Sequence, residues 1–253
     1  MSLGGHLREL RKRLYWIALF VLVGGVFGWL AFDPIFAALQ APVKALDANP
    51  KFNATINFGS VVSAFDLRLQ TSLFVGVVAT SPLWLHQVWL FVSPAMRRRE
   101  KRYTVGFTFT ATPLFLAGCA LGWYAMPGFV TTMLAFTPEG SANVINANEY
   151  ILFTLRILIV FGIAFVLPVI LIFMNFLGIL SAKTILKSWR FAIFTSVFIA
   201  AIATPVSDPM SMFLVSVPLI VFYFISAGIA TLHDKRKLGK QSVSDDVRPL
   251  EEL

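Results

Sequence analysis

Residues 91–103 read Phe91-Val-Ser-Pro-Ala-Met-Arg-Arg-Arg-Glu-Lys-Arg-Tyr103 and join two long apolar segments. Five of these residues are cations, and Glu100 is the single acid among them. A short basic connection between apolar runs is typical of a loop at a membrane surface with a spanning helix on each side. The stretch therefore predicts a helical membrane protein, and a function for this loop must account for one carboxylate among five positive charges.

The composition of the whole chain agrees with this prediction. The 253 residues are 57% hydrophobic and 13% charged, and the mean hydropathy is +0.77, which is too apolar for a soluble domain. The net charge of +8 comes from short basic blocks rather than from one continuous face, so nucleic-acid binding is not expected. Cys119, the only cysteine, falls in an apolar run and is expected in the core. The three histidines are far apart, so we expect no metal site, no cofactor and no catalytic group.

The hydrophobic pattern predicts an all-α integral membrane protein with six transmembrane helices in one domain. The fifth span has room for only about 20 Å of helix against roughly 30 Å of hydrocarbon, so the bilayer thins there or the following turn lies below its surface. The outer segment at 33–71, here called the cap loop, should be structured, and its first part is a candidate for a short surface helix. In chain order the expected segments are an interfacial amphipathic helix at 1–14, spans at 15–32, 72–92, 105–126, 150–176, 191–203 and 210–232, outer segments at 33–71 (the cap loop), 127–149 and 204–209, cytoplasmic loops at 93–104 and 177–190, and a tail at 233–253 whose end should be disordered.

The distribution of lysine and arginine predicts the orientation. These residues gather in the N-terminal segment, in the loops 93–104 and 177–190, and in the tail, whereas the opposite loops hold few of them. By the positive-inside rule, both termini are expected in the cytoplasm.

Prolines inside the spans suggest bent helices. Each removes a backbone hydrogen bond, so several bent helices side by side could form a concave wall, although membrane helices also tolerate proline without such a role. Pro127 and Gly128 are expected to end the third span. The four interior prolines are Pro82, Pro113, Pro168 and Pro218.

Ionisable residues are almost missing from the predicted spans. Arg156 is the exception, and it could extend toward the outer surface or pair with Glu149 or Asp208. Ion-coupled transporters and membrane enzymes usually carry carboxylates, histidines or a nucleophile at mid-membrane. The pattern favours a receptor or an assembly scaffold.

Several motifs resemble one family. Residues 6–14, His6-Leu-Arg-Glu-Leu-Arg-Lys-Arg-Leu14, and residues 82–100, which include Gln87-Val-Trp-Leu-Phe-Val-Ser-Pro94 and Glu100, are similar to the TatC family, the multi-spanning receptors of the twin-arginine protein translocase. Residues 162–165, Pro168-Val169 and 204–208 are similar to its later motifs, so the resemblance covers nearly the whole chain.

This resemblance implies a function in the bacterial plasma membrane. A TatC receptor binds twin-arginine signal peptides and, with the single-span subunits TatA and TatB, exports folded proteins using the proton-motive force, as a homo-oligomer within a larger complex. The family fold is a glove-like wall of bent helices. The matching positions are Glu9, Arg11, Phe91 and Glu100 for signal-peptide binding, and Pro42, Phe65 and Asp208 for function on the outer side.

Two positions depart from the family pattern. The family usually has a glutamate where this chain has Val166 and often a glutamine near the position of Met212, and these polar groups are thought to contact TatA or TatB. We therefore expect partners whose matching position is also apolar, or partners that dock elsewhere.

The charge of the basic loop sets a condition on peptide binding. Five cations should repel a peptide with two arginines, unless Glu100 faces the binding pocket and its basic neighbours turn toward anionic lipid headgroups.

The alternatives to a receptor are a six-helix transporter of small solutes and a purely structural scaffold. A receptor should move no solute when reconstituted alone, and a scaffold should show no sequence-specific peptide binding.

Overall fold

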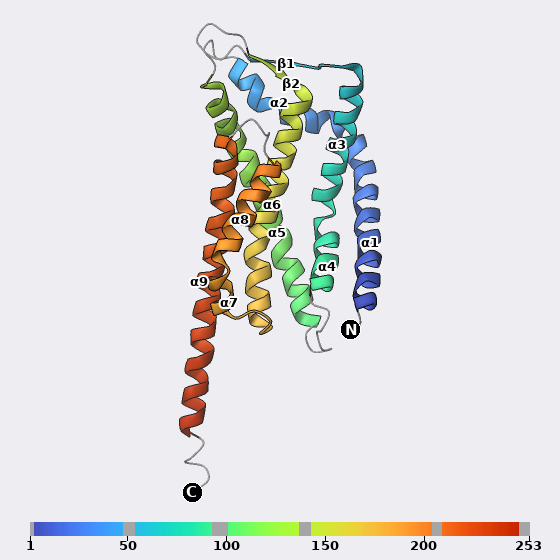
Figure 1. Ribbon diagram of the computed structural model, residues 1–253. Coiled ribbons are helices and arrows are strands. Elements are labelled where there is room, and N and C mark those ends of the chain that lie inside the picture. The colour runs from blue at the N-terminus through green and yellow to red at the C-terminus, as the bar shows by residue number, and fades with distance from the viewer. Residues whose placement is uncertain (1–2, 48–53, 93–100, 137–142, 204–208, 248–253) are drawn as a thin grey trace.

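The computed structural model describes residues 3–47, 54–92, 101–136, 143–203 and 209–247. Its helices run side by side, and α2, β1 and β2 gather at one end of the bundle, here called the cap end (Figure 1). Helix α1 begins and α9 ends at the opposite, terminal end, beyond which α9 extends (Figure 1). The elements are α1 (Leu3–Leu30), α2 (Phe32–Asp47), β1 (Ala54–Asn57), α3 (Val61–Ala79), α4 (Ser81–Val92), α5 (Lys101–Leu134), β2 (Asn143–Asn146), α6 (Ala147–Phe176), α7 (Ala182–Lys187), α8 (Trp189–Ala203) and α9 (Pro209–Val247).

In the described part of the chain, five helices are long and apolar enough to cross a membrane, namely α1, α3, α5, α6 and α9. The remaining predicted span corresponds to α8, which is apolar but shorter. With 15 residues, α8 is about 22 Å long, as the short apolar run had indicated.

Three helices continue past boundaries that the sequence had predicted. Helix α1 runs without a break through the junction at residues 14 and 15, so the amphipathic segment and the first span are one helix. The prediction that Pro127 and Gly128 end the third span was wrong, because α5 continues to Leu134. In the turn after the proline, the hydroxyl of Thr131 donates to the carbonyl of Pro127 at 2.9 Å, and that of Thr132 donates to the carbonyl of Gly128 at 2.8 Å. Helix α9 likewise continues through most of the predicted tail.

The second predicted span is interrupted at Thr80, between α3 and α4. Pro82 therefore lies in the first turn of α4 rather than inside a helix, and its missing N–H costs little at that position. The break frees the carbonyl of Val77, and the indole N–H of Trp84 donates to it at 2.8 Å. This bond explains how an interruption inside an apolar segment keeps its backbone satisfied.

The cap adds a small sheet to the predicted all-α fold. Strands β1 and β2 pair in parallel, with Ala54 opposite Asn143 and Asn57 opposite Asn146. Asn146 also caps α6, because its side-chain oxygen accepts from the N–H of Asn148 at 2.9 Å. Four-residue strands are too short to give a periodic signal, so the sequence did not predict them. As expected, the first part of the cap loop forms a helix, α2.

Two tight helix pairs hold the bundle together. Glycines bring α1 close to α3: a Cβ added to Gly24 would lie 2.9 Å from the Cα of Gly76. Helices α5 and α6 approach equally closely, because a Cβ on Gly118 would lie 2.9 Å from the Cα of Gly162. Small residues at such crossings allow apolar helices to gain packing energy in lipid, where the hydrophobic effect between helices is absent.

Candidate functional site

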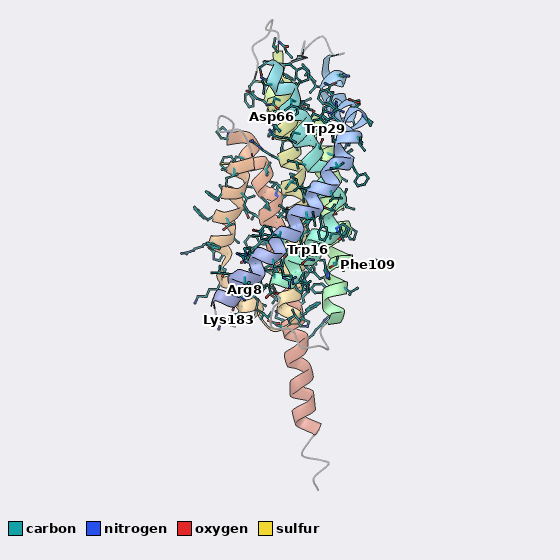
Figure 2. All side chains as sticks on the ribbon, turned by 90° about the vertical axis from the view of Figure 1, so that its right-hand side faces the viewer. Arg8, Trp16, Trp29, Asp66, Phe109 and Lys183 are labelled. Atoms are coloured by element: carbon teal, nitrogen blue, oxygen red, sulfur yellow. The ribbon has the colours of Figure 1, made fainter. Side chains whose placement is uncertain are left out.

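A groove opens between α1 and α4 at the terminal end of the bundle. Its volume is about 500 Å³, and one wall comes from the first turns of α1, where Arg8 and Trp16 lie along the helix (Figure 2). The other wall comes from the last turns of α4. The lining residues are Gly5, Arg8, Glu9, Lys12, Arg13, Trp16, Gln87 and Leu90.

Among the described residues that line this groove, Glu9 is the only acid. The guanidinium of Arg13, one helical turn away, donates to Oε1 of Glu9 from Nη2 at 2.6 Å and from Nε at 3.2 Å. Both bonds reach the same oxygen, so within the described residues Oε2 of Glu9 accepts no hydrogen bond. The two side chains remain 19% (Arg13) and 25% (Glu9) exposed, which leaves the carboxylate accessible from the groove.

Arg13 has a second partner across the groove. Its Nη1 donates to Oε1 of Gln87 at 3.0 Å, and this bond links α1 to α4. The guanidinium of Arg13 is bonded to the carboxylate of Glu9 and to the amide of Gln87. If a ligand binds the carboxylate, Arg13 therefore keeps the amide as a partner. The arrangement allows Arg13 to be displaced from Glu9 without becoming unpaired.

The charges around the carboxylate are unbalanced. Arg8, Lys12 and Arg13 bring three cations to the groove against the one carboxylate of Glu9. The groove alone would therefore repel a dicationic ligand. Glu100 lies outside the described residues, but it directly precedes α5 and follows α4 by eight residues, and α4 forms one wall of the groove.

The predicted peptide-binding residues are only partly brought together. Glu9 lies in the groove, but Arg11 is exposed and is not part of its lining. Phe91 is half-buried and directly follows Leu90, a lining residue. Four other residues line the groove but were not predicted to bind the peptide, namely Arg13, Trp16, Gln87 and Leu90. A signal existed for Arg13, since it follows Glu9 by four residues.

Two of the three predicted outer-side residues, Pro42 and Phe65, lie at the cap end. Phe65 is 62% exposed and packs edge-on against Trp29 with ring centroids 5.9 Å apart. The guanidinium of Arg68 lies over the same indole at 4.9 Å, so these side chains join α1 to α3. Pro42 is half-buried inside α2, and Asp208 lies outside the described residues.

The two candidate partner contacts differ in their surroundings. Val166 is only 3% exposed and belongs to an apolar cluster that includes Phe107, Phe115 and Trp89. Its side chain is not on the surface of this chain. Met212 is partly buried against the larger core cluster. Among the described residues, no group of histidine, cysteine, aspartate or glutamate side chains is arranged to hold a metal ion.

The sequence and the fold of this chain are similar to those of known proteins. Residues 5–218 match the family model "Sec-independent protein translocase protein (TatC)". The TatC protein of Xylanimonas cellulosilytica is 42% identical over 93% of this chain and 86% of its own length, and TatCy of Bacillus subtilis is 36% identical over 97% and 94%. A crystal structure described as the twin-arginine translocase receptor TatC superposes with a TM-score of 0.78 at 27% identity, covering 90% of this chain and 98% of the other. This bundle of long apolar helices is therefore similar to these proteins in both sequence and fold. The chain belongs to the TatC family of Sec-independent protein translocase proteins.

Proposed function

We propose that this chain is the receptor for twin-arginine signal peptides and that the groove between α1 and α4 takes part in binding them. The observation that carries the proposal is the carboxylate of Glu9, which is exposed to a groove and has one oxygen that accepts no hydrogen bond from the described residues. Family membership makes the chain a multi-pass membrane component of the Tat system, and the solved relative is described as a receptor.

A signal-peptide arginine would bind Glu9 by displacing Arg13. An arginine fork pairs with both oxygens of a carboxylate, whereas Arg13 uses only one of them. Arg13 then keeps its bond to Gln87. Each charge-assisted hydrogen bond contributes about 1.5–3 kcal/mol, and lysine cannot reproduce the fork. Trp16 and Leu90 offer apolar surface to the hydrophobic part of the peptide.

Glu100 is proposed as the second carboxylate. A peptide with two arginines needs more negative charge than Glu9 supplies, because Arg8, Lys12 and Arg13 surround it. Glu100 satisfies this need if the cations beside it in the loop bind anionic headgroups, each contributing about 1 kcal/mol of attraction to the membrane. Arg11 and Phe91 would act beside the groove rather than inside it.

The remaining parts of the proposal follow from the family. The chain works with other Tat subunits, which we propose to be TatA and TatB, and exports folded proteins across the bacterial plasma membrane using the proton-motive force. It would act as one of several copies in a receptor complex, with six spans and both termini in the cytoplasm. The basic blocks at the N-terminus, in two loops and in the tail support this orientation.

Binding of signal peptides to the purified protein tests the proposal. A peptide with paired arginines is compared with its lysine-lysine version, for the native protein and for Glu9→Gln and Glu100→Gln. We expect each variant to lose about tenfold or more of the affinity for the arginine peptide and to lose the preference over lysine, because about 1.4 kcal/mol corresponds to tenfold.

Glu149→Gln is the matched control, since Glu149 is an exposed glutamate in the first turn of α6 at the cap end. It should bind both peptides like the native protein. Equal affinity of the native protein for the two peptides would contradict the receptor proposal, and solute transport by the protein reconstituted alone would favour a transporter.

A further inference from the structure

Arg156 is a cation on the apolar surface of α6. It is exposed, and in the described part of the chain no ion pair or hydrogen bond involves it. Glu149, one of the two carboxylates considered as its partner, is seven residues away and forms no bond with it, and Asp208 lies outside the described residues. Arg156 lies nine residues into α6, or about 14 Å along the helix from the cap end.

A cavity surrounds this guanidinium. Its volume is about 470 Å³, and among the described residues its lining apart from Arg156 is aliphatic: Ile159 and Val160 from α6, and Ile199 and Ile202 from α8. The cavity lies between α6 and α8, which pack against each other. Branched aliphatic walls suit an acyl chain, and a guanidinium suits a phosphate.

Helix α8 is short for a hydrocarbon layer of ordinary thickness. Its 15 residues extend about 22 Å, against roughly 30 Å of hydrocarbon. Ile202, next to the last residue of α8, lines the cavity, and α8 ends well short of the cap end of α6 (Figure 1). A bilayer that thins beside this short helix would bring its headgroups toward Ile202 and Arg156, which line the same cavity.

We propose that Arg156 and this cavity bind a phospholipid of the cap-side leaflet, with the phosphate on the guanidinium and an acyl chain against the isoleucines. The lipid would neutralise the cation and anchor the local thinning of the bilayer beside the short helix α8. Charge complementarity favours a lipid over an apolar helix of a partner, which would leave the guanidinium unpaired in hydrocarbon. The site is separate from the groove between α1 and α4, so it does not depend on peptide binding.

Native mass spectrometry of the purified protein tests the site. Dioleoyl phosphatidylglycerol is titrated against dioleoylglycerol, which has the same chains but no phosphate. We expect the native protein to retain one phosphatidylglycerol about tenfold more tightly than Arg156→Gln does, and to retain dioleoylglycerol no better than the variant. Arg156→Lys should recover part of the affinity, because lysine keeps the charge but not the fork.

The controls separate this site from other basic surfaces. Lys183→Gln removes an exposed cation from α7 at the terminal end and should leave the tightest lipid in place. Signal-peptide binding by Arg156→Gln should equal that of the native protein, which shows that the variant is folded. Equal lipid retention by Arg156→Gln would overturn the inference. So would displacement of the lipid by millimolar inorganic phosphate, or occupation of the cavity by a Tat partner with no lipid bound.

Discussion

At the scale of single residues, Gln87 sets how easily Arg13 can release Glu9. If a peptide arginine binds the carboxylate of Glu9, the displaced guanidinium of Arg13 keeps its hydrogen bond to Gln87 at 3.0 Å. We expect Gln87→Leu to weaken binding of the arginine peptide by about three- to tenfold, since one hydrogen bond contributes about 0.5–1.5 kcal/mol. Titration of the labelled peptide measures the change.

Gln70→Leu is the control for that substitution. Gln70 bonds to Asp66 within α3, away from the groove, so its loss should leave peptide affinity unchanged. If Gln87→Leu bound the peptide as tightly as the native protein, Arg13 would not need a second partner and the displacement step would be wrong.

The same residues show how far sequence reasoning reaches into the site. The pair of Glu9 and Arg13 is local, four residues apart on one helix, so its spacing in the sequence is a signal for the contact. Gln87 is 74 residues from Arg13, and only the contact of α1 with α4 brings them together. The motif at residues 87–94 shows that Gln87 lies shortly before the basic loop. The spacing of residues in the sequence cannot show that its partner is Arg13.

At the scale of the elements, the approach of α1 to α3 depends on Gly76. A Cβ at this position would lie 2.7 Å from the backbone nitrogen of Gly25 and would also contact the carbonyl of Val21. Because backbone atoms cannot yield as side chains do, Gly76→Ala should force the helices apart and cost about 1–3 kcal/mol of stability. The measurement is the midpoint of thermal unfolding in detergent.

Gly228→Ala provides the comparison, because a Cβ on Gly228 in α9 meets nothing within 4 Å. It should leave the midpoint unchanged or raise it slightly, since alanine favours helix. An unfolding midpoint of Gly76→Ala equal to that of Gly228→Ala would show that α1 and α3 can separate freely.

Long apolar runs predicted long helices, and α6 begins and ends within three residues of the predicted span at 150–176. The ends of other helices could not be predicted in this way. Pro127 normally signals a helix end, yet α5 continues past it to Leu134. The interruption at Thr80, where the indole of Trp84 donates to the carbonyl of Val77, gives no signal in the apolar run. Both are local backbone features that hydropathy does not contain.

At the scale of the whole molecule, α8 decides on which side the chain ends. Helices α6 and α9 both end toward the terminal end of the bundle, so α8 has to carry the chain back toward the cap between them (Figure 1). The five long helices alone would place the two termini on opposite faces of the membrane. If α8 is a sixth crossing, as we propose, both termini lie on one face, and the positive-inside rule then assigns that face to the cytoplasm.

This topology predicts which introduced cysteines a membrane-impermeant maleimide can reach. The native Cys119 is buried and gives a low background. In cells whose plasma membrane is intact, Asn57→Cys, at the cap, should react, whereas Lys12→Cys, in the groove, should react only after the plasma membrane is permeabilised. The reverse pattern would place the groove outside the cell, away from newly made signal peptides. Reaction of both before permeabilisation would mean that α1 does not cross the membrane, and the six-span fold would then be wrong.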